Sequence, residues 1–239
     1  MNEIKKAVIM AAGKGERLRP ITLTTPKPLI CVNGKCIIET VINGLMENGI
    51  SDICVVVGHL GEQFTKLKQK YPDLTLIQNR YYESCNNISS LYSAKQFLDD
   101  CVMLIDGDQM INDPSILGRR FDRSGYTAAW TDSYTNEWLM TLTDDIVSGC
   151  SRNGGKHGWQ LYGVSRWTKE DANKLRAHTI LEFETKQNRD IYWDDIPMFF
   201  HSSEYELGIS KIKGNEIREI DTIAELAAAD PKYSEYIKD

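Results

Sequence analysis

The sequence predicts a doubly wound α/β fold with a mostly parallel sheet, to which the second half of the chain adds a small antiparallel extension. Three observations predict it. An apolar run from Ala7 to Met10 is typical of a parallel strand buried on both faces. Strand and helix patterns then alternate to about residue 77, as in a doubly wound sheet. From Gly125 onward the patterns change to short strands linked by turns.

Hydrophobic spacing locates the individual elements. Between Cys36 and Asn48 the apolar side chains fall on one helical stripe, and Gly49 provides a C-terminal stop. Short apolar runs bounded by turn residues predict the strands. The other expected elements are strands over 53–57, 74–77, 101–105, 126–130, 138–142, 146–150, 160–164 and 217–221, a charged helix after Gly61, and helices over 91–98, over 169–183 and after Thr222.

Length and composition indicate one globular domain. The chain of 239 residues is 41% hydrophobic and 26% charged, and no linker rich in Pro, Gly or Ser divides it. We therefore expect a single domain over 1–239, with 1–125 and 126–239 as its halves. The net charge of −6 argues against a nucleic-acid partner. Because no apolar run approaches the roughly 18 residues of a membrane span and the cysteines form no C-x-x-C pair, we expect a cytoplasmic protein without membrane insertion.

A glycine-rich turn follows the first strand and predicts a polyphosphate site. Small residues let the backbone approach a ligand closely, so that its N–H groups point at phosphate oxygens. Cations follow at Arg17, Arg19 and Lys27. The run lacks the Walker pattern, and the dinucleotide fingerprint fails because its third position is Leu18. The residues of the expected phosphate loop are Ala11, Ala12, Gly13, Lys14 and Gly15.

A polar turn over 84–90 has two interpretations. Asn and Ser are preferred helix N-caps, so the turn could serve only to start the next helix. An Asn amide also offers one acceptor and two donors, which match the amino and carbonyl edge of cytosine. On this second interpretation Asn86, Asn87 and Ser89 bind the nucleoside.

Carboxylates follow two of the expected strands. Asp106 and Asp108 come after the strand over 101–105, at the edge of a parallel sheet where ligands bind and where an acid can share Mg²⁺ with phosphates. An ordinary D-G turn is the alternative. Asp221 precedes the helix that starts at Thr222, a position usually taken by a capping element, and Glu219 lies two residues earlier.

Aromatic and acidic residues are mixed over 190–195. Such residues are often partly buried core. Aromatic faces with negative charge nearby also hold quaternary ammonium groups, and Trp138 could supply a further wall. The candidates for a pocket of this kind are Trp138, Tyr192, Trp193 and Asp194.

The full run A-A-G-x-G-x-R-L-x-P-x-T over 11–22, with P-K-P-L over 26–29, resembles the nucleotidyltransferases that join an NTP to a phosphorylated small molecule. The resemblance implies a Rossmann-like sheet with a phosphate loop over 13–17. The site residues that it implies are Lys27 and Arg17 for catalysis, Asp108 and Asp221 for one Mg²⁺, and Asn86 and Asn87 for the nucleoside.

Further stretches resemble the bacterial CTP:phosphocholine cytidylyltransferases over nearly the whole chain. The resemblance implies transfer of CMP from CTP to phosphocholine, giving CDP-choline and pyrophosphate, with the pocket aromatics around the choline. Glu219 would then face either solvent or the cationic acceptor, whereas 151–159 and 195–200 depart from the pattern. The matching stretches are Thr135-Asn136-Glu137-Trp138, Gly163-Val164-Ser165, Tyr192-Trp193-Asp194, and Asn86-Asn87 followed by Ser90-Leu91-Tyr92.

Several alternatives remain open at this point. We expect direct in-line attack by the acceptor, since no Ser, Cys or His stands in a nucleophile arrangement. Phosphoethanolamine and 2-aminoethylphosphonate are alternative acceptors, and a sugar-1-phosphate nucleotidyltransferase would share the first loop. A nucleotide sensor without turnover is an alternative of another class, and the joint retention of Lys27, Asp108 and Asp221 argues against it. The residues do not separate CTP from other pyrimidine NTPs, and they leave the oligomeric state open.

Overall fold

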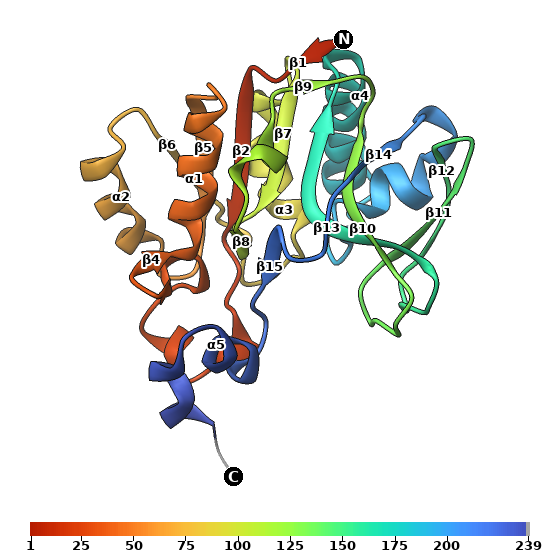
Figure 1. Cartoon of the computed structure of the whole chain (residues 1–239). Coiled ribbons are helices and arrows are strands. Elements are labelled where there is room, and N and C mark those ends of the chain that lie inside the picture. Colours follow the sequence, from red (N-terminus) through yellow and green to blue (C-terminus); the bar gives the residue numbers. More distant parts are fainter. Residues whose placement is uncertain (238–239) are drawn as a thin grey trace.

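A mixed sheet of nine strands forms the centre of the computed structural model, which describes residues 1–237 (Figure 1). Its strands are β2 (Lys6–Ala11), β5 (Asp52–Val57), β6 (Thr75–Gln78), β7 (Val102–Asp106), β10 (Gly125–Thr131), β11 (Leu139–Thr143), β12 (Ile146–Ser151), β13 (Gly158–Trp167) and β14 (Gly208–Lys211). They lie in the order β12-β11-β13-β7-β2-β5-β6, and β10 joins β13 to β14. The neighbours β7, β2, β5 and β6 run parallel, and β13 pairs with β7 antiparallel. The predicted fold class is confirmed.

Helices cover both faces of the parallel strands. They are α1 (Ile37–Glu47), α2 (Thr65–Lys70), α3 (Ile88–Ser93), α4 (Lys169–Ile180) and α5 (Ile223–Ala229). The alternation along β2 shows the two sides, because Ile9 packs in one core cluster with α1 and Val8 packs in another with α3 and α4. None of the helices in the described residues is long and apolar enough to cross a membrane.

Three small two-stranded ribbons complete the structure. They are β1 (Asn2–Glu3) with β9 (Arg120–Phe121), β3 (Cys31–Val32) with β4 (Lys35–Cys36), and β8 (Gln109–Ile111) with β15 (Ile217–Glu219). The ribbon of β8 and β15 lies beside the lower end of the parallel strands in Figure 1, where it holds Ile217–Glu219 next to Gln109–Ile111.

Two details differ from the sequence prediction. The helix expected over 91–98 begins earlier, as α3, and a separate 3₁₀ turn over Lys95–Phe97 follows it. Several strands of only two to four residues were not expected, because such short runs carry no periodicity; they are β1, β3, β4, β8, β9 and β14. The central sheet contains strands from both 1–125 and 126–239, and the assignment of the nucleotide and the acceptor to separate halves stays a prediction.

Candidate active site

The glycine-rich loop lies at the carboxyl end of β2 and borders a cavity of about 490 Å³. Gly15 has a left-handed φ of 60°, and a Cβ there would lie 2.9 Å from the Thr22 side chain. The Thr22 hydroxyl donates to the Gly15 carbonyl at 2.8 Å and so fixes the turn. Only glycine suits this position. Of the predicted loop residues, Ala11, Ala12, Gly13 and Gly15 line the cavity and Lys14 does not.

Lys27 lies between two carboxylates from distant parts of the chain. Its Nζ atom is 2.9 Å from Oδ2 of Asp108 and 2.5 Å from Oδ1 of Asp221. Burial alone would lower the pKa of Lys27, but the two carboxylates outweigh burial and raise it. Arg17 adds a second cation, 3.0 Å from Oδ1 of Asp221. The four predicted residues are therefore brought together at one wall of the cavity.

Three carboxyl groups converge beside Lys27. Oxygens of Asp108, Glu219 and Asp221 lie within 4.8 Å of one another. Oδ1 of Asp108 is buried and has no hydrogen-bond partner within residues 1–237. Burial, followed by the charges of both aspartates, raises the pKa of Glu219 to about 8. Convergent oxygens with one buried acceptor unpaired suit a hard divalent cation such as Mg²⁺, so the residues present fit this ion.

Local strand pairing explains how Asp221 reaches Asp108. In the β8–β15 ribbon Glu219 lies opposite Gln109, which places the residues just outside both strands side by side. After Asp221 the chain enters α5 through a capping box, in which Thr222 accepts from the Glu225 backbone N–H. The Glu225 carboxylate in turn accepts from the Asp221 backbone N–H at 2.8 Å. The cap therefore holds the backbone of the acid itself.

Asn87 and Ser90 are the residues of the polar turn that line the cavity. Oδ1 of Asn87 accepts from the Trp193 backbone N–H at 2.8 Å. The side-chain nitrogen of Asn87, Nδ2, makes no hydrogen bond within residues 1–237. Asn86 instead fixes the turn, because its Oδ1 accepts from the Asn87 N–H and its Nδ2 donates to the Asp190 carbonyl. Ser89 is buried and donates to the Asn86 carbonyl. Asn87 is the N-cap residue of α3, but its side chain makes no capping hydrogen bond. Binding of the nucleoside by Asn86, Asn87 and Ser89 stays a prediction.

A smaller pocket of about 230 Å³ adjoins this cavity, and the two share Arg17, Asn87 and Tyr192 among their lining residues. Trp138 packs edge-on against Tyr192, with ring centroids 5.8 Å apart. Burial raises the pKa of Asp194 to about 7. The pocket also contains a group of acids, which are Asp106, Glu137, Asp194, Glu219 and Asp221.

Comparison with known proteins gives consistent matches. The sequence model of the nucleotidyl transferase family matches residues 6–122. The chain is 38% identical to the 2-aminoethylphosphonate cytidylyltransferase of Lancefieldella rimae, over 97% of this chain and 94% of the relative. It is 37% identical to the choline-phosphate cytidylyltransferase of Streptococcus pneumoniae, over 91% of this chain and 93% of the relative. The chain belongs to the nucleotidyltransferase family.

A solved structure supports the same conclusion for this nucleotidyltransferase. The CTP:phosphocholine cytidylyltransferase of Streptococcus pneumoniae superposes with a TM-score of 0.87 at 35% identity, covering 99% of this chain and 100% of that one. The resemblance drawn from the sequence is thereby confirmed, and the chain is an enzyme of the cytidylyltransferase group.

One predicted wall of the acceptor pocket is corrected. Trp193 is only 3% exposed, and its ring stacks on Tyr126 and meets Trp167 edge-on, each at 6.0 Å. Tyr192, which is 47% exposed, lines the pocket instead. Consecutive residues of this turn face opposite directions, so only one of the two aromatics can reach the pocket. The aromatic walls of this nucleotidyltransferase are therefore Trp138 and Tyr192.

Three features of the pocket were missed by sequence reasoning. Glu219 was expected to face either solvent or the cationic acceptor, although its position two residues before Asp221 on extended chain places both side chains on one side. Asp106 was passed over for Asp108, yet its carboxylate fills the space over Gly163, where a Cβ would lie 2.3 Å from Oδ2. Arg152 supports the aromatic wall from behind, with its guanidinium 4.0 Å from the Phe199 ring. No sequence pattern indicated the last two contacts.

Proposed function

We propose that this nucleotidyltransferase transfers CMP from CTP to phosphocholine, releasing CDP-choline and pyrophosphate. The observation that carries the proposal is the acidic, aromatic-walled pocket directly beside the phosphate loop. Trp138 and Tyr192 offer ring faces to a quaternary ammonium, and a bound cation would favour the ionised forms of Asp194 and Glu219. Arg17 lies between the pocket and the cavity, where the acceptor phosphate would meet the nucleotide.

The chemistry requires positioning and neutralisation of charge. A phosphate monoester has its second pKa near about 6, so the acceptor is an oxyanion at neutral pH and needs no general base. Lys27, Arg17 and the loop N–H groups can neutralise the charge that builds up as this anion approaches the α-phosphorus. Asp108, Asp221 and Glu219 would hold Mg²⁺, which supplies further neutralisation of the nucleotide phosphates when bound.

The choice of CTP rests on the relatives, which are named as cytidylyltransferases, and the polar turn supports a pyrimidine base. The Asn87 amide nitrogen faces the cavity and is available as a donor to the carbonyl oxygen of a pyrimidine. We also propose that the protein is cytoplasmic, since both of its proposed substrates would be metabolites in that compartment.

2-Aminoethylphosphonate is the second candidate acceptor. The pocket contains more carboxyl groups than aromatic rings, and carboxylates pair directly with a primary ammonium. Phosphoethanolamine also carries a primary ammonium, so the same carboxyl groups could bind it. A sugar 1-phosphate fits less well, because the pocket offers acids and aromatic faces where hydroxyl groups would have to be recognised.

One experiment separates these possibilities. Purified protein with Mg²⁺ is offered CTP, UTP, ATP or GTP, crossed with phosphocholine, phosphoethanolamine, 2-aminoethylphosphonate and glucose 1-phosphate, and pyrophosphate release is measured. We expect the highest kcat/KM for CTP with phosphocholine. A higher value for 2-aminoethylphosphonate would transfer the assignment to the second candidate. Absence of pyrophosphate release with every pair would leave only a nucleotide-sensing role.

A further inference from the structure

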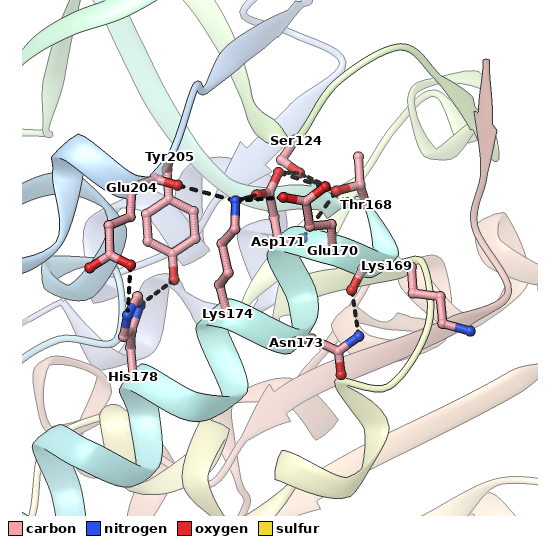
Figure 2. A network of polar contacts seen from close by, with 10 residues as sticks. All are labelled: Ser124, Thr168, Lys169, Glu170, Asp171, Asn173, Lys174, His178, Glu204 and Tyr205. Atoms are coloured by element: carbon pink, nitrogen blue, oxygen red, sulfur yellow. Dashed lines mark hydrogen bonds and ion pairs between the residues drawn. The ribbon is translucent and has the colours of Figure 1, made fainter.

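A second group of ligand-type side chains lies away from the active site, where the end of α4 meets the segment that follows the turn over 196–200. His178 lies in the last turns of α4, and Figure 2 shows it beside Glu204 and Tyr205. His201 stacks on His178, with ring centroids 3.8 Å apart. The Glu204 carboxylate reaches both rings, since Oε2 is 3.3 Å from Nε2 of His178 and Oε1 is 3.3 Å from Nδ1 of His201.

Each imidazole is oriented through its other nitrogen. Nε2 of His201 lies 2.8 Å from the fully buried carboxylate of Glu182, which also accepts from Lys186 and Asn188. Nδ1 of His178 lies 2.8 Å from the Tyr205 hydroxyl. A carboxylate behind one histidine and a hydroxyl behind the other are the supports that metal-binding histidines usually have, because they fix the tautomer and the ring angle.

The facing nitrogens and the carboxylate are spaced as ligands of one ion. The three donor atoms lie within 4.8 Å of one another. For Zn–N and Zn–O bonds of about 2.0–2.1 Å, the edge of a tetrahedron is about 3.3 Å, which is the distance from each histidine nitrogen to its nearest carboxylate oxygen, Oε2 for His178 and Oε1 for His201. Because each imidazole lone pair lies in its ring plane and the two planes are within 10° of parallel, the rings must turn apart before both nitrogens can bind one ion.

We propose that His178, His201 and Glu204 form a binding site for a divalent transition-metal ion, best matched by Zn²⁺. Two imidazoles and one carboxylate favour zinc over Mg²⁺, which prefers oxygen ligands. The Glu204 side chain is 51% exposed, so an ion can enter from solvent and keep a water as its fourth ligand. Lys174 holds the backbone carbonyl of Glu204 at 3.4 Å, which keeps the carboxylate near the rings (Figure 2).

An ion here would close a loop of the chain. Residues between His178 and His201 include the segment that carries Tyr192 and Asp194. Because the ion joins α4 to the end of this segment, it would stabilise the wall of the smaller pocket against local opening. This role is independent of which acceptor the enzyme uses.

The test uses the full chain, stripped of metal by chelation and then kept in excess Mg²⁺ to occupy the carboxylates beside Lys27. Zn²⁺ is titrated by calorimetry, and the histidine side-chain nitrogens are followed by ¹⁵N NMR. We expect one Zn²⁺ per chain, a higher melting temperature, and coordination shifts at Nε2 of His178 and Nδ1 of His201. His201→Gln and Glu204→Gln should each weaken binding by at least about tenfold, whereas His157→Ala, at an exposed histidine elsewhere, should not.

Three results would overturn the proposal. The first is absence of saturable binding. The second is binding that persists in both variants but is lost in Asp221→Asn, which would place the ion at the active site. The third is an NMR spectrum in which the two rings take up protons but show no coordination shift. The NMR measurement uses the unmodified chain, so the proposal can be refuted even if the variants fold poorly.

Discussion

At the scale of single residues, Lys27 is the centre of the candidate site. It is only 7% exposed, and its ammonium neutralises Asp108 and Asp221 at the same time. Since a buried ammonium is costly to leave unpaired, the two acids keep Lys27 charged and extended toward the cavity. The charge is thereby already in position when phosphate charge develops.

Lys27→Ala should lower kcat by at least about a hundredfold, in line with the loss of one preorganised electrostatic contact. The far-UV circular dichroism should not change, because the side chain lies at the cavity wall. Lys66→Ala, at an exposed lysine of α2, is the matched control and should leave kcat unchanged. An unaltered kcat at saturating substrates would remove Lys27 from the mechanism.

Asp108→Asn and Asp221→Asn should each raise the Mg²⁺ concentration needed for half-maximal rate, since an amide keeps the shape but loses the charge of a hard-cation ligand. If both bind one ion, the double variant should lose much less than the product of the single losses. Rates measured over a Mg²⁺ titration decide this. Losses that multiply strictly would mean that the two acids act separately.

At the scale of elements, the capping box of α5 is expected to position the Asp221 carboxylate for Mg²⁺ as well as to stabilise the helix. Thr222→Ala should cost about 1 kcal/mol of unfolding free energy and also raise the Mg²⁺ requirement, because Glu225 then holds the Asp221 backbone less firmly. Thr168 is the N-cap of α4, where its side chain accepts from the Asp171 backbone N–H, and provides the control. Thr168→Ala should lose similar stability in urea without a change in Mg²⁺ requirement. Equal Mg²⁺ titrations for the two variants would contradict the idea.

Trp138, which lines the smaller pocket, and Trp193, which is buried, should respond differently to replacement by leucine. A desolvated cation–π contact is worth about 2 kcal/mol, or roughly thirtyfold in affinity. Trp138→Leu should therefore raise KM for phosphocholine by about that factor, with little change in KM for CTP. Trp193→Leu should instead lower the unfolding free energy, on the order of 2 kcal/mol, and leave KM nearly unchanged. Steady-state kinetics and urea unfolding separate the two, and a reversed pattern would restore Trp193 as a wall.

These elements also show what the sequence could and could not predict. The apolar runs of β2, β5 and β7 and the stripe of α1 carry their own periodicity, so their positions were predicted closely. The acids after β7 and β15 were found because they follow strands. The directions of Tyr192 and Trp193 were not, since an irregular turn has no period from which to infer a face. The packing of Asp106 against Gly163 was not predicted for a related reason, because no sequence pattern shows where its carboxylate points.

At the scale of the whole molecule, the fold lines the smaller pocket with more carboxyl groups than cationic groups. Burial is the first cause that raises the pKa of both Asp194 and Asp106. Between its ordinary value of 3.8 and about 7, Asp194 is protonated in the folded chain and ionised in the unfolded one. The folded state then binds more protons, so this contribution to stability is present at low pH and is lost as pH rises toward about 7.

Asp194→Asn should accordingly gain stability relative to the parent chain as the pH rises from about 4 to about 8, by on the order of a few kcal/mol. Urea unfolding of both chains across this range measures the difference. Asp190→Asn, at an exposed acid of the same segment, should show no pH-dependent gain in unfolding free energy over the parent chain. A difference that does not change with pH would mean that Asp194 is ionised in the folded chain throughout.

The ion pairs of Lys27 with Asp108 and Asp221 have a further consequence during protein synthesis. The ribosome releases a chain from its N-terminus at about 5–20 residues per second, so the glycine-rich loop and Lys27 emerge long before the acid that follows β15. A nascent or prematurely terminated chain can build the parallel strands without the complete set of carboxylates. On the proposed role of Asp221, a chain that ends before this residue lacks one of the two carboxylates that pair with Lys27 and should not release pyrophosphate from CTP.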